Sequence, residues 1–453
     1  MNSSTVRGQW ASRLGFILAA AGSAIGLGNI WKFPYITGQN GGGAFVLVYL
    51  VCILLVGLPI MMAELHIGRR GQRDAVGCFT VLEKKRTPWR FIGWLGVCSS
   101  FLLLSFYAVV AGWSFDYVVQ AASGGFRGRS AEEINALFGQ LVSSPAQVIF
   151  WQGSFLVATV GIVVGGVRGG IERWSKILMP LLFLLLLLLF LRGMFSPGAK
   201  AGLEFMFRPD FARLTPAALL DALGHAFFTL SLGAATMITY GSYLDEKADL
   251  LSLSLRITLL DIMVALLAGL AIFPVVFAAG LEPNSGPGLV FQTIPIVFSS
   301  MPFGSILAVL FFLLLSFAAL SSSISMLEVS VSYLVDEKGW GRGLSTLLLG
   351  GAAFVVGIPS ALSFNRLAGF TPFFGQTFFD FVNALVSSYL LPLGGFFVAV
   401  YAGWFWKGSR RQDALDGGKD RPWLYPVWHV LIKYLAPGAV AVVLLNQIGW
   451  FSP

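Results

Sequence analysis

The stretch "AGSAIGLGNIWKFP", residues 21–34, lies inside the first long apolar segment of the chain. Gly22, Gly26 and Gly28 would each destabilise a helix interior by about 1 kcal/mol relative to alanine. Asn29 and Lys32 then place an amide and a charge where a membrane-spanning helix should be apolar. The stretch therefore predicts an interrupted membrane helix with a polar site at the interruption.

The composition predicts a membrane protein. Of the 453 residues, 56% are hydrophobic and 11% are charged, and the mean hydropathy is +0.79. A soluble domain carries about 25% charged residues, which excludes a large soluble helical protein. Three cysteines give no indication of a disulfide framework. The net charge of +8 comes from Lys and Arg in short loops, where they act as topology signals and not as a nucleic-acid surface.

Hydropathy predicts an all-α polytopic membrane protein with eleven spans, each of about 20 or more mainly apolar residues. We place them near residues 10–38, 42–68, 90–122, 146–166, 171–192, 216–241, 253–279, 303–335, 343–359, 373–406 and 425–451.

The distribution of Lys and Arg predicts the orientation. With a cytoplasmic N-terminus, 22 of the 30 Lys and Arg residues fall inside, seven fall outside, and Lys32 lies within the membrane. This excess predicts a multi-pass protein of the plasma (inner) membrane with the N-terminus inside and the C-terminus outside. The first span shows no small-residue cleavage pattern, so we expect no cleavable signal peptide.

A second interruption is predicted in the sixth span, at "FFTLSLGAATMITYGSY", residues 227–243. Spans one and six each open a group of five, and because five is odd the two groups are inverted relative to each other. Interrupted helices at corresponding positions of inverted halves indicate a midplane binding site; the alternative is that these glycines only allow close helix packing. We expect a 5+5 inverted repeat, with residues 1–192 and 193–406 as the repeats and 407–453 as a cytoplasmic loop and the eleventh span.

Five motifs carry a resemblance to a known family. They are "WASRLGFILAAAGSAIGLGNIWKFPY" (10–35), "NGGGAF" (40–45), "GIERWSKILMP" (170–180), "FFTLSLG" (227–233) and "SSSI" (321–324). In this order they resemble the neurotransmitter:sodium symporter family over nearly the whole chain. The resemblance implies a leucine-transporter-like fold with broken helices 1 and 6, and eleven spans are typical of a bacterial member.

The resemblance implies two sodium sites built from oxygen atoms, the ligands that suit a hard cation. For the serines taken alone, hydrogen bonding between helices is the more ordinary role. The implied ligands are the Ala24 carbonyl with the side chains of Asn29, Thr229 and Asp261 for one site, and the carbonyls of Gly22, Ile25 and Ala318 with the hydroxyls of Ser321 and Ser322 for the other.

The resemblance also implies an amino acid or amine as substrate. Its carboxylate would meet backbone N–H groups, a tyrosine hydroxyl and one sodium ion, and its amino group would meet carbonyls and a serine hydroxyl. The implied binding residues are Ala24, Leu27, Gly28, Leu103, Tyr107, Phe228, Thr229, Ser231, Ala234, Ser322 and Met326.

Two gates are implied on either side of this site. At the outer entrance Lys32, where the family usually has Arg, would pair with Asp380, and lysine offers only a point charge. At the cytoplasmic exit the implied residues are Arg7 and Asp336, with Trp10 and Tyr243 beside them.

The three histidines lie in different spans, without the clustering that a metal site needs. His225 stands where many relatives have Gln. A packed, neutral imidazole and a pH-sensitive one are both open interpretations.

We predict a sodium-coupled importer of amino acids that works by alternating access, and not an enzyme, since no paired nucleophile and base appears. A channel fits poorly, because tight binding at several points slows conduction; a receptor of the same fold that does not transport remains the alternative. Asp261 would supply the negative charge that chloride supplies in relatives with Asn there, so transport should be chloride-independent. Gly170 and Pro180 in span five would let that helix unwind, or alternatively only pack and kink it.

The side-chain pocket predicts the substrate class. Ala234 stands where the leucine transporter has Phe, and Met326 is flexible enough to repack. The pocket offers no charged partner, so the sequence predicts large hydrophobic L-amino acids, with aromatic ones ahead of Leu and Ile.

Overall fold

The structure is a computed structural model that describes residues 8–280, 289–406, 415, 421, 423–447 and 450. In this part of the chain the secondary structure is helical, apart from one isolated bridge between Phe373 and Gln376. The predicted all-α class is therefore confirmed.

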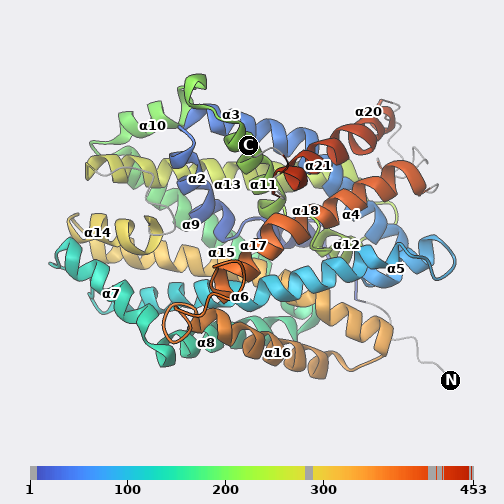
Figure 1. Ribbon diagram of the computed structural model, residues 1–453, viewed down its shortest axis with the longest axis horizontal. Coiled ribbons are helices and arrows are strands. Elements are labelled where there is room, and N and C mark those ends of the chain that lie inside the picture. The colour runs from blue at the N-terminus through green and yellow to red at the C-terminus, as the bar shows by residue number, and fades with distance from the viewer. Residues whose placement is uncertain are drawn as a thin grey trace.

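Nine helices of the described residues are long and apolar enough to cross a bilayer. In Figure 1 they run roughly from left to right, side by side in a bundle. Four of them contain a π-helical segment. The nine are α3–η2–α4 (Gly43–Cys52, Ile53–Gly57, Leu58–Gly71), α6 (Arg90–Ala122), α8 (Pro145–Val163), η3–α9 (Val167–Glu172, Arg173–Met194), α13 (Leu250–Ala278), α15 (Gly304–Lys338), α16 (Arg342–Leu362), α17–η6–α18–η7 (Phe378–Ala384, Leu385–Leu390, Leu391–Val400, Tyr401–Phe405) and α20–η9–α21 (Leu424–Val430, Leu431–Leu435, Ala436–Gln447).

The first span is broken, as predicted. It consists of α1 (Arg13–Ala24), which is followed after three residues by η1 (Gly28–Lys32) and α2 (Phe33–Gln39), and the two parts are bent by 48°. With this pair the described residues hold ten candidate spans.

The sixth span is broken too. It consists of α11 (Pro216–Thr229) and α12 (Thr236–Gly241), and neither half is long enough to cross a bilayer alone. The six residues between them include Ser231, Gly233 and Ala235, whose φ angles are 54°, 75° and 57°. These left-handed conformations end α11 and turn the chain before α12.

Short helices outside the long spans escaped prediction. They are α5 (Ala75–Leu82), α7 (Ala131–Ser143), α10 (Ala199–Phe207), η4 (Phe211–Arg213), η5 (Leu289–Thr293) and α14 (Ile294–Ser299). In Figure 1, α7, α10 and α14 lie at the left end of the bundle and α5 at the right end. We call these the α7 end and the α5 end.

Small residues allow α1 to lie deep in the bundle. A Cβ at Gly22 would stand 3.0 Å from the Met179 sulfur of α9 and 3.1 Å from the Ser321 Cβ of α15. A Cβ at Gly15 would overlap the Glu172 side chain. Close packing thus explains Gly22, and it places the interruption of α1 against α15 and α13.

Candidate functional site

Side chains from neighbouring helices hold the interruption between α11 and α12. The buried carboxylate of Glu64 on α4 accepts a hydrogen bond from the Gly233 N–H at 2.7 Å. The hydroxyl of Ser100 on α6 donates to the Ala234 carbonyl at 2.6 Å. Backbone groups freed at membrane depth need such partners, so side chains of α4 and α6 stabilise this interruption.

Three buried side chains meet where the interruptions of α1 and α11 face α13. Asp261 Oδ1 accepts from the Thr229 hydroxyl at 2.8 Å and from the Asn29 amide at 2.8 Å. The Thr229 hydroxyl also lies 3.1 Å from Asn29 Oδ1, and the Tyr49 hydroxyl donates to Asp261 Oδ2 at 3.3 Å. These side chains form what we call the first oxygen cluster. Ala24, whose carbonyl was expected to join them, lines the neighbouring cavity together with Thr229.

A second oxygen cluster lies between the interruption of α1 and the middle of α15. The Ser321 hydroxyl lies 2.8 Å from the Ala318 carbonyl and 3.3 Å from the Ile25 carbonyl. The Ser322 hydroxyl lies 3.4 Å from the Gly22 carbonyl. The structure therefore brings together all five groups that the resemblance implied, and every ligand atom offered is a carbonyl or hydroxyl oxygen.

A central cavity lies between these two clusters. The free volume among its side chains is about 20 Å³, enough for about one water molecule. All eleven residues implied as substrate-binding line it. The Tyr107 hydroxyl accepts a hydrogen bond from the Leu27 N–H at 3.3 Å, across the mouth of the interruption.

Sequence reasoning missed three residues of the central cavity: Ser23, Gly26 and Leu391. Ser23 and Gly26 belong to the interrupted stretch itself, so their position could have been inferred. Leu391 lies on α18, 65 residues after Met326, the last expected cavity residue, and no local pattern distinguishes it from other leucines.

A larger cavity, the entrance cavity, leads from the α7 end to the central one. Its volume is about 450 Å³, and Tyr107 and Phe228 line both cavities. Lys32 and Asp380 both line it, but no ion pair joins them among the described residues. Lys32 Nζ lies 4.6 Å from the centre of the Phe228 ring, and Asp380 accepts from the Thr377 hydroxyl at 2.7 Å. The expected pairing of Lys32 with Asp380 is therefore absent from this structure, because each group has another neighbour.

Aromatic contacts close the α5 end. The Trp10 indole donates to the Tyr240 carbonyl at 3.0 Å, and the Trp10 ring packs edge-on against Tyr240 and Tyr243. The Tyr243 hydroxyl donates to the buried Glu328 carboxylate at 2.7 Å, and Glu328 also pairs with Arg342. Arg7, the predicted partner of Asp336, lies outside the described residues.

Asp336 belongs to a carboxylate cluster at the same end. Its carboxylate accepts from the Asp74 N–H at 2.8 Å, and Arg73 pairs with the neighbouring Glu337 at 2.9 Å. Burial raises the pKa of Asp74, the N-cap of α5, to about 7, and the nearby charges of Glu337 and Asp336 act in the same direction.

His225 is packed between aromatic rings. Its ring lies 5.9 Å from that of Phe33 and 5.2 Å from that of Tyr49, and 1% of the residue is exposed. Neither ring nitrogen has a hydrogen-bond partner in the described part of the chain. The surroundings favour the neutral imidazole of the two interpretations, and the described residues hold no group of three His, Cys, Asp or Glu placed to bind a metal.

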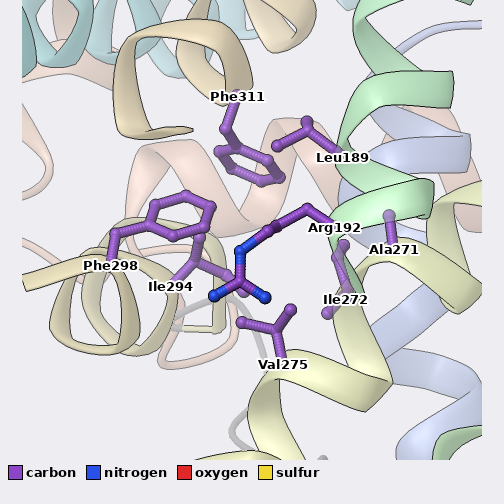
Figure 2. Close-up of a pocket in the computed structure, with 8 residues that line it drawn as sticks. All are labelled: Leu189, Arg192, Ala271, Ile272, Val275, Ile294, Phe298 and Phe311. Atoms are coloured by element: carbon purple, nitrogen blue, oxygen red, sulfur yellow. The ribbon is translucent and has the colours of Figure 1, made fainter. Parts of the chain in front are cut away.

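One further pocket lies away from these clusters. Arg192 extends from the end of α9 among apolar side chains of α13, α14 and α15 (Figure 2). None of the residues that the sequence analysis singled out lines it, so it is not the candidate site.

Two interrupted helices that face each other around a buried cavity are the architecture of secondary transporters with inverted repeats. The chain belongs to the sodium:neurotransmitter symporter family, whose model matches residues 7–127 and 138–453.

Relatives cover almost the whole chain. The uncharacterized sodium-dependent transporter YhdH of Bacillus subtilis is 42% identical over 98% of both chains. The human sodium- and chloride-dependent taurine transporter is 26% identical over 98% of this chain and 79% of its own. The crystal structure of MhsT in complex with L-phenylalanine matches with a TM-score of 0.90 at 47% identity, over 97% of this chain and all of that one. This match confirms the leucine-transporter-like fold.

Proposed function

We propose that this protein imports hydrophobic L-amino acids together with sodium ions by alternating access. The observation that carries the proposal is the position of the central cavity. It lies directly between two clusters of oxygen atoms, and Ser322 and Thr229 each belong both to a cluster and to the cavity wall. An amino acid bound in the cavity would lie next to both proposed sodium ions.

The chemistry of the clusters suits sodium. Both consist of carbonyl, amide, hydroxyl and carboxylate oxygens, which hard cations prefer to sulfur or imidazole. Hydrogen bonds bring the hydroxyl oxygens of Ser321 and Ser322 close to carbonyl oxygens of α1 and α15. One cation could bind all of these oxygens if the two hydroxyl protons turned away. We therefore assign one sodium ion to each cluster.

The substrate class follows from the cavity lining. Tyr107 and the Leu27 and Gly28 backbone suit a carboxylate, because N–H groups at a helix start favour an anion and, among the described residues, the Leu27 N–H has only the Tyr107 hydroxyl to exchange for one. The remaining walls are mostly apolar, and MhsT, at 47% identity, is a protein that binds L-phenylalanine. With a free volume of only about 20 Å³, the cavity must widen for a large side chain. Met326 and Phe228 are the side chains that would move.

Asp261 supports chloride-independent transport. Its carboxylate is fully buried in the first oxygen cluster, and its side-chain partners among the described residues are the Thr229 and Tyr49 hydroxyls and the Asn29 amide. A sodium ion would supply the missing positive charge, and the pair would leave no net charge for an anion to balance. A proton could replace the sodium ion on the return step.

The gates suit alternating access. The entrance cavity is open toward the α7 end, while Trp10, Tyr240 and Tyr243 pack together at the α5 end. We propose that the α5 end faces the cytoplasm, that Asp336 and Arg7 complete the inner gate, and that Lys32 meets Asp380 when the outer gate closes. Residues 1–192 and 193–406 would form the two inverted repeats.

A receptor that binds the amino acid without moving it is the second candidate, and uptake distinguishes the two. The purified protein would be reconstituted into proteoliposomes and given labelled L-tryptophan with and without an inward sodium gradient. Accumulation that needs the gradient supports the transporter. Sodium-dependent binding without accumulation would instead establish the receptor.

A further inference from the structure

A chain of three serines connects the two interruptions to α15. Ser23, at the end of α1, has its hydroxyl 2.7 Å from the hydroxyl of Ser325 on α15 and 3.3 Å from that of Ser231. The Ser231 hydroxyl in turn donates to the Ser23 carbonyl at 3.0 Å. Ser23 and Ser325 are 2% and 1% exposed, so water does not compete for these contacts.

Each serine hydroxyl has one proton to donate, which limits which serine of this chain is the donor and which the acceptor. The Ser325 hydroxyl donates its one proton to the Ser322 carbonyl at 2.7 Å. While that proton points to the Ser322 carbonyl, Ser325 acts as the acceptor for the Ser23 hydroxyl. The Ser231 hydroxyl is held by its own bond to the Ser23 carbonyl. The Ser322 hydroxyl donates to the Ser23 carbonyl at 3.1 Å, so residues of α15 contact both the carbonyl and the hydroxyl of Ser23.

Ser325 itself belongs to neither oxygen cluster and does not line the central cavity. It nevertheless connects the two. On one side it bonds the backbone of Ser322, a member of the second oxygen cluster; on the other it holds Ser23, which lines the cavity and bonds Ser231.

We infer that Ser325 is a positioning residue that couples sodium at the second oxygen cluster to amino-acid binding in the central cavity. The inference rests on the proposed function. Sodium between α1 and α15 fixes the spacing of the two helices, and at that spacing Ser325 orients Ser23 and, through it, Ser231. Without the Ser325 hydroxyl, sodium would still bind, but less of its effect would reach the cavity.

The test is equilibrium binding of labelled L-tryptophan to the purified protein over a range of sodium concentrations. In wild type, sodium should increase the affinity for tryptophan. In Ser325→Ala this increase should fall about fivefold, as expected for one net hydrogen bond, while the sodium-induced rise in Tm without amino acid is retained. A purely structural loss would weaken binding equally at every sodium concentration, and that result would overturn the inference.

The same helix offers a matched control. Ser323 is also buried, also donates to the carbonyl three residues earlier, and also has a hydroxyl–hydroxyl contact, at 2.8 Å, but with Thr159 of α8 on the opposite face. Ser323→Ala should leave the sodium effect unchanged. An equal loss in both variants would refute a specific role for Ser325.

Two further variants separate the partners of Ser325. The Tyr240 hydroxyl also contacts Ser325, so Tyr240→Phe should keep the sodium effect if Ser23 is the partner that matters. Ser23→Ala combined with Ser325→Ala should lose no more of the sodium effect than Ser23→Ala alone. Additive losses would contradict the coupling, whereas a wild-type protein with no sodium-dependent binding would refute the proposed function itself.

Discussion

At the scale of single residues, Asp261 is a carboxylate whose burial is energetically unfavourable and for which we propose a role as a sodium ligand. It is a fully buried carboxylate at membrane depth, held by Asn29, Thr229 and Tyr49. Such groups are functional by default. We expect equal uptake by the wild type in chloride and gluconate buffers. Asp261→Asn keeps the side-chain volume but removes the charge, so the variant should require chloride or lose transport. Uptake by the wild type that depended strongly on chloride would contradict this assignment.

Ala234 tests the substrate pocket. Its side chain lines the central cavity, whose free volume is about 20 Å³, and its carbonyl is fixed by Ser100. A phenylalanine ring at this position cannot share the cavity with an indole ring. Ala234→Phe should therefore weaken tryptophan binding by at least about fivefold, as overpacking costs about 1–3 kcal/mol. Competition against labelled tryptophan measures this loss.

Competing amino acids supply the control for Ala234→Phe. Leucine has a smaller side chain, so its affinity should fall less than that of tryptophan. Glycine, glutamate and lysine should compete poorly in the wild type, because the first leaves the cavity unfilled and the others would bury an unpaired charge. Preference of the wild type for glycine or alanine would show that the pocket has been assigned to the wrong residues.

The candidate site shows what sequence can supply at this scale. The family resemblance implied the eleven cavity residues, seven of them inside the quoted motifs, and the structure gathers all eleven around one cavity. The partners that hold the site were not predicted. Tyr49 and Glu64 lie on another helix, and Ser100 and Ser325 lie within three residues of cavity residues but outside the family motifs. Their contacts depend on how helices cross, which local patterns do not encode.

At the scale of elements, the interruptions were predictable and the finer irregularities were not. Glycine and polar residues mark the breaks in α1 and α11, because they are costly in an apolar helix. The π-helical segments η2, η6, η7 and η9 consist mainly of apolar residues, and no local pattern distinguishes their sequences from those of α-helices. The short helices α5 and α7 begin at side-chain caps, Asp74 and the Ser130–Glu133 capping box, which hydropathy does not detect.

Helix α9 carries the prediction that belongs to this scale. Pro180 lies inside α9 without breaking it, and Gly170 is needed for packing because a Cβ there would overlap the Ile162 carbonyl. Unwinding of span five therefore depends on Pro180, which removes one backbone hydrogen bond. Pro180→Ala restores that bond and should lower the transport rate at least about fivefold. Tryptophan affinity should stay within about twofold, since Pro180 lies outside the cavity.

A second helix-interior proline provides the comparison for Pro180→Ala. Pro359 lies within α16 (Arg342–Leu362), which contributes to neither oxygen cluster. Pro359→Ala should leave the transport rate unchanged. The unwinding hypothesis would fail if Pro180→Ala transported at the wild-type rate, or if both variants slowed transport equally.

At the scale of the whole molecule, charge and fold together predict which end faces the cytoplasm. Helix α6 has 33 residues and is about 50 Å long, so the loops at its two ends must lie on opposite sides of the membrane. Lys85 precedes α6 and Arg129 follows it, and both are exposed. Because the topology predicted from the sequence assigns 22 of the 30 Lys and Arg residues to the side of Lys85, we expect that side to be cytoplasmic.

Cysteine labelling in intact cells tests this orientation. In a background without Cys52, Cys78 and Cys98, a membrane-impermeant maleimide should label Arg129→Cys directly. It should label Lys85→Cys only after the cells are permeabilised. The opposite pattern would show that the protein has the reverse orientation in the membrane, with the entrance cavity at the α7 end facing the cytoplasm. Import from outside would then require an opening at the α5 end, which Trp10, Tyr240 and Tyr243 close in this structure. This single experiment therefore also tests whether the open side of the structure is the one that receives the substrate.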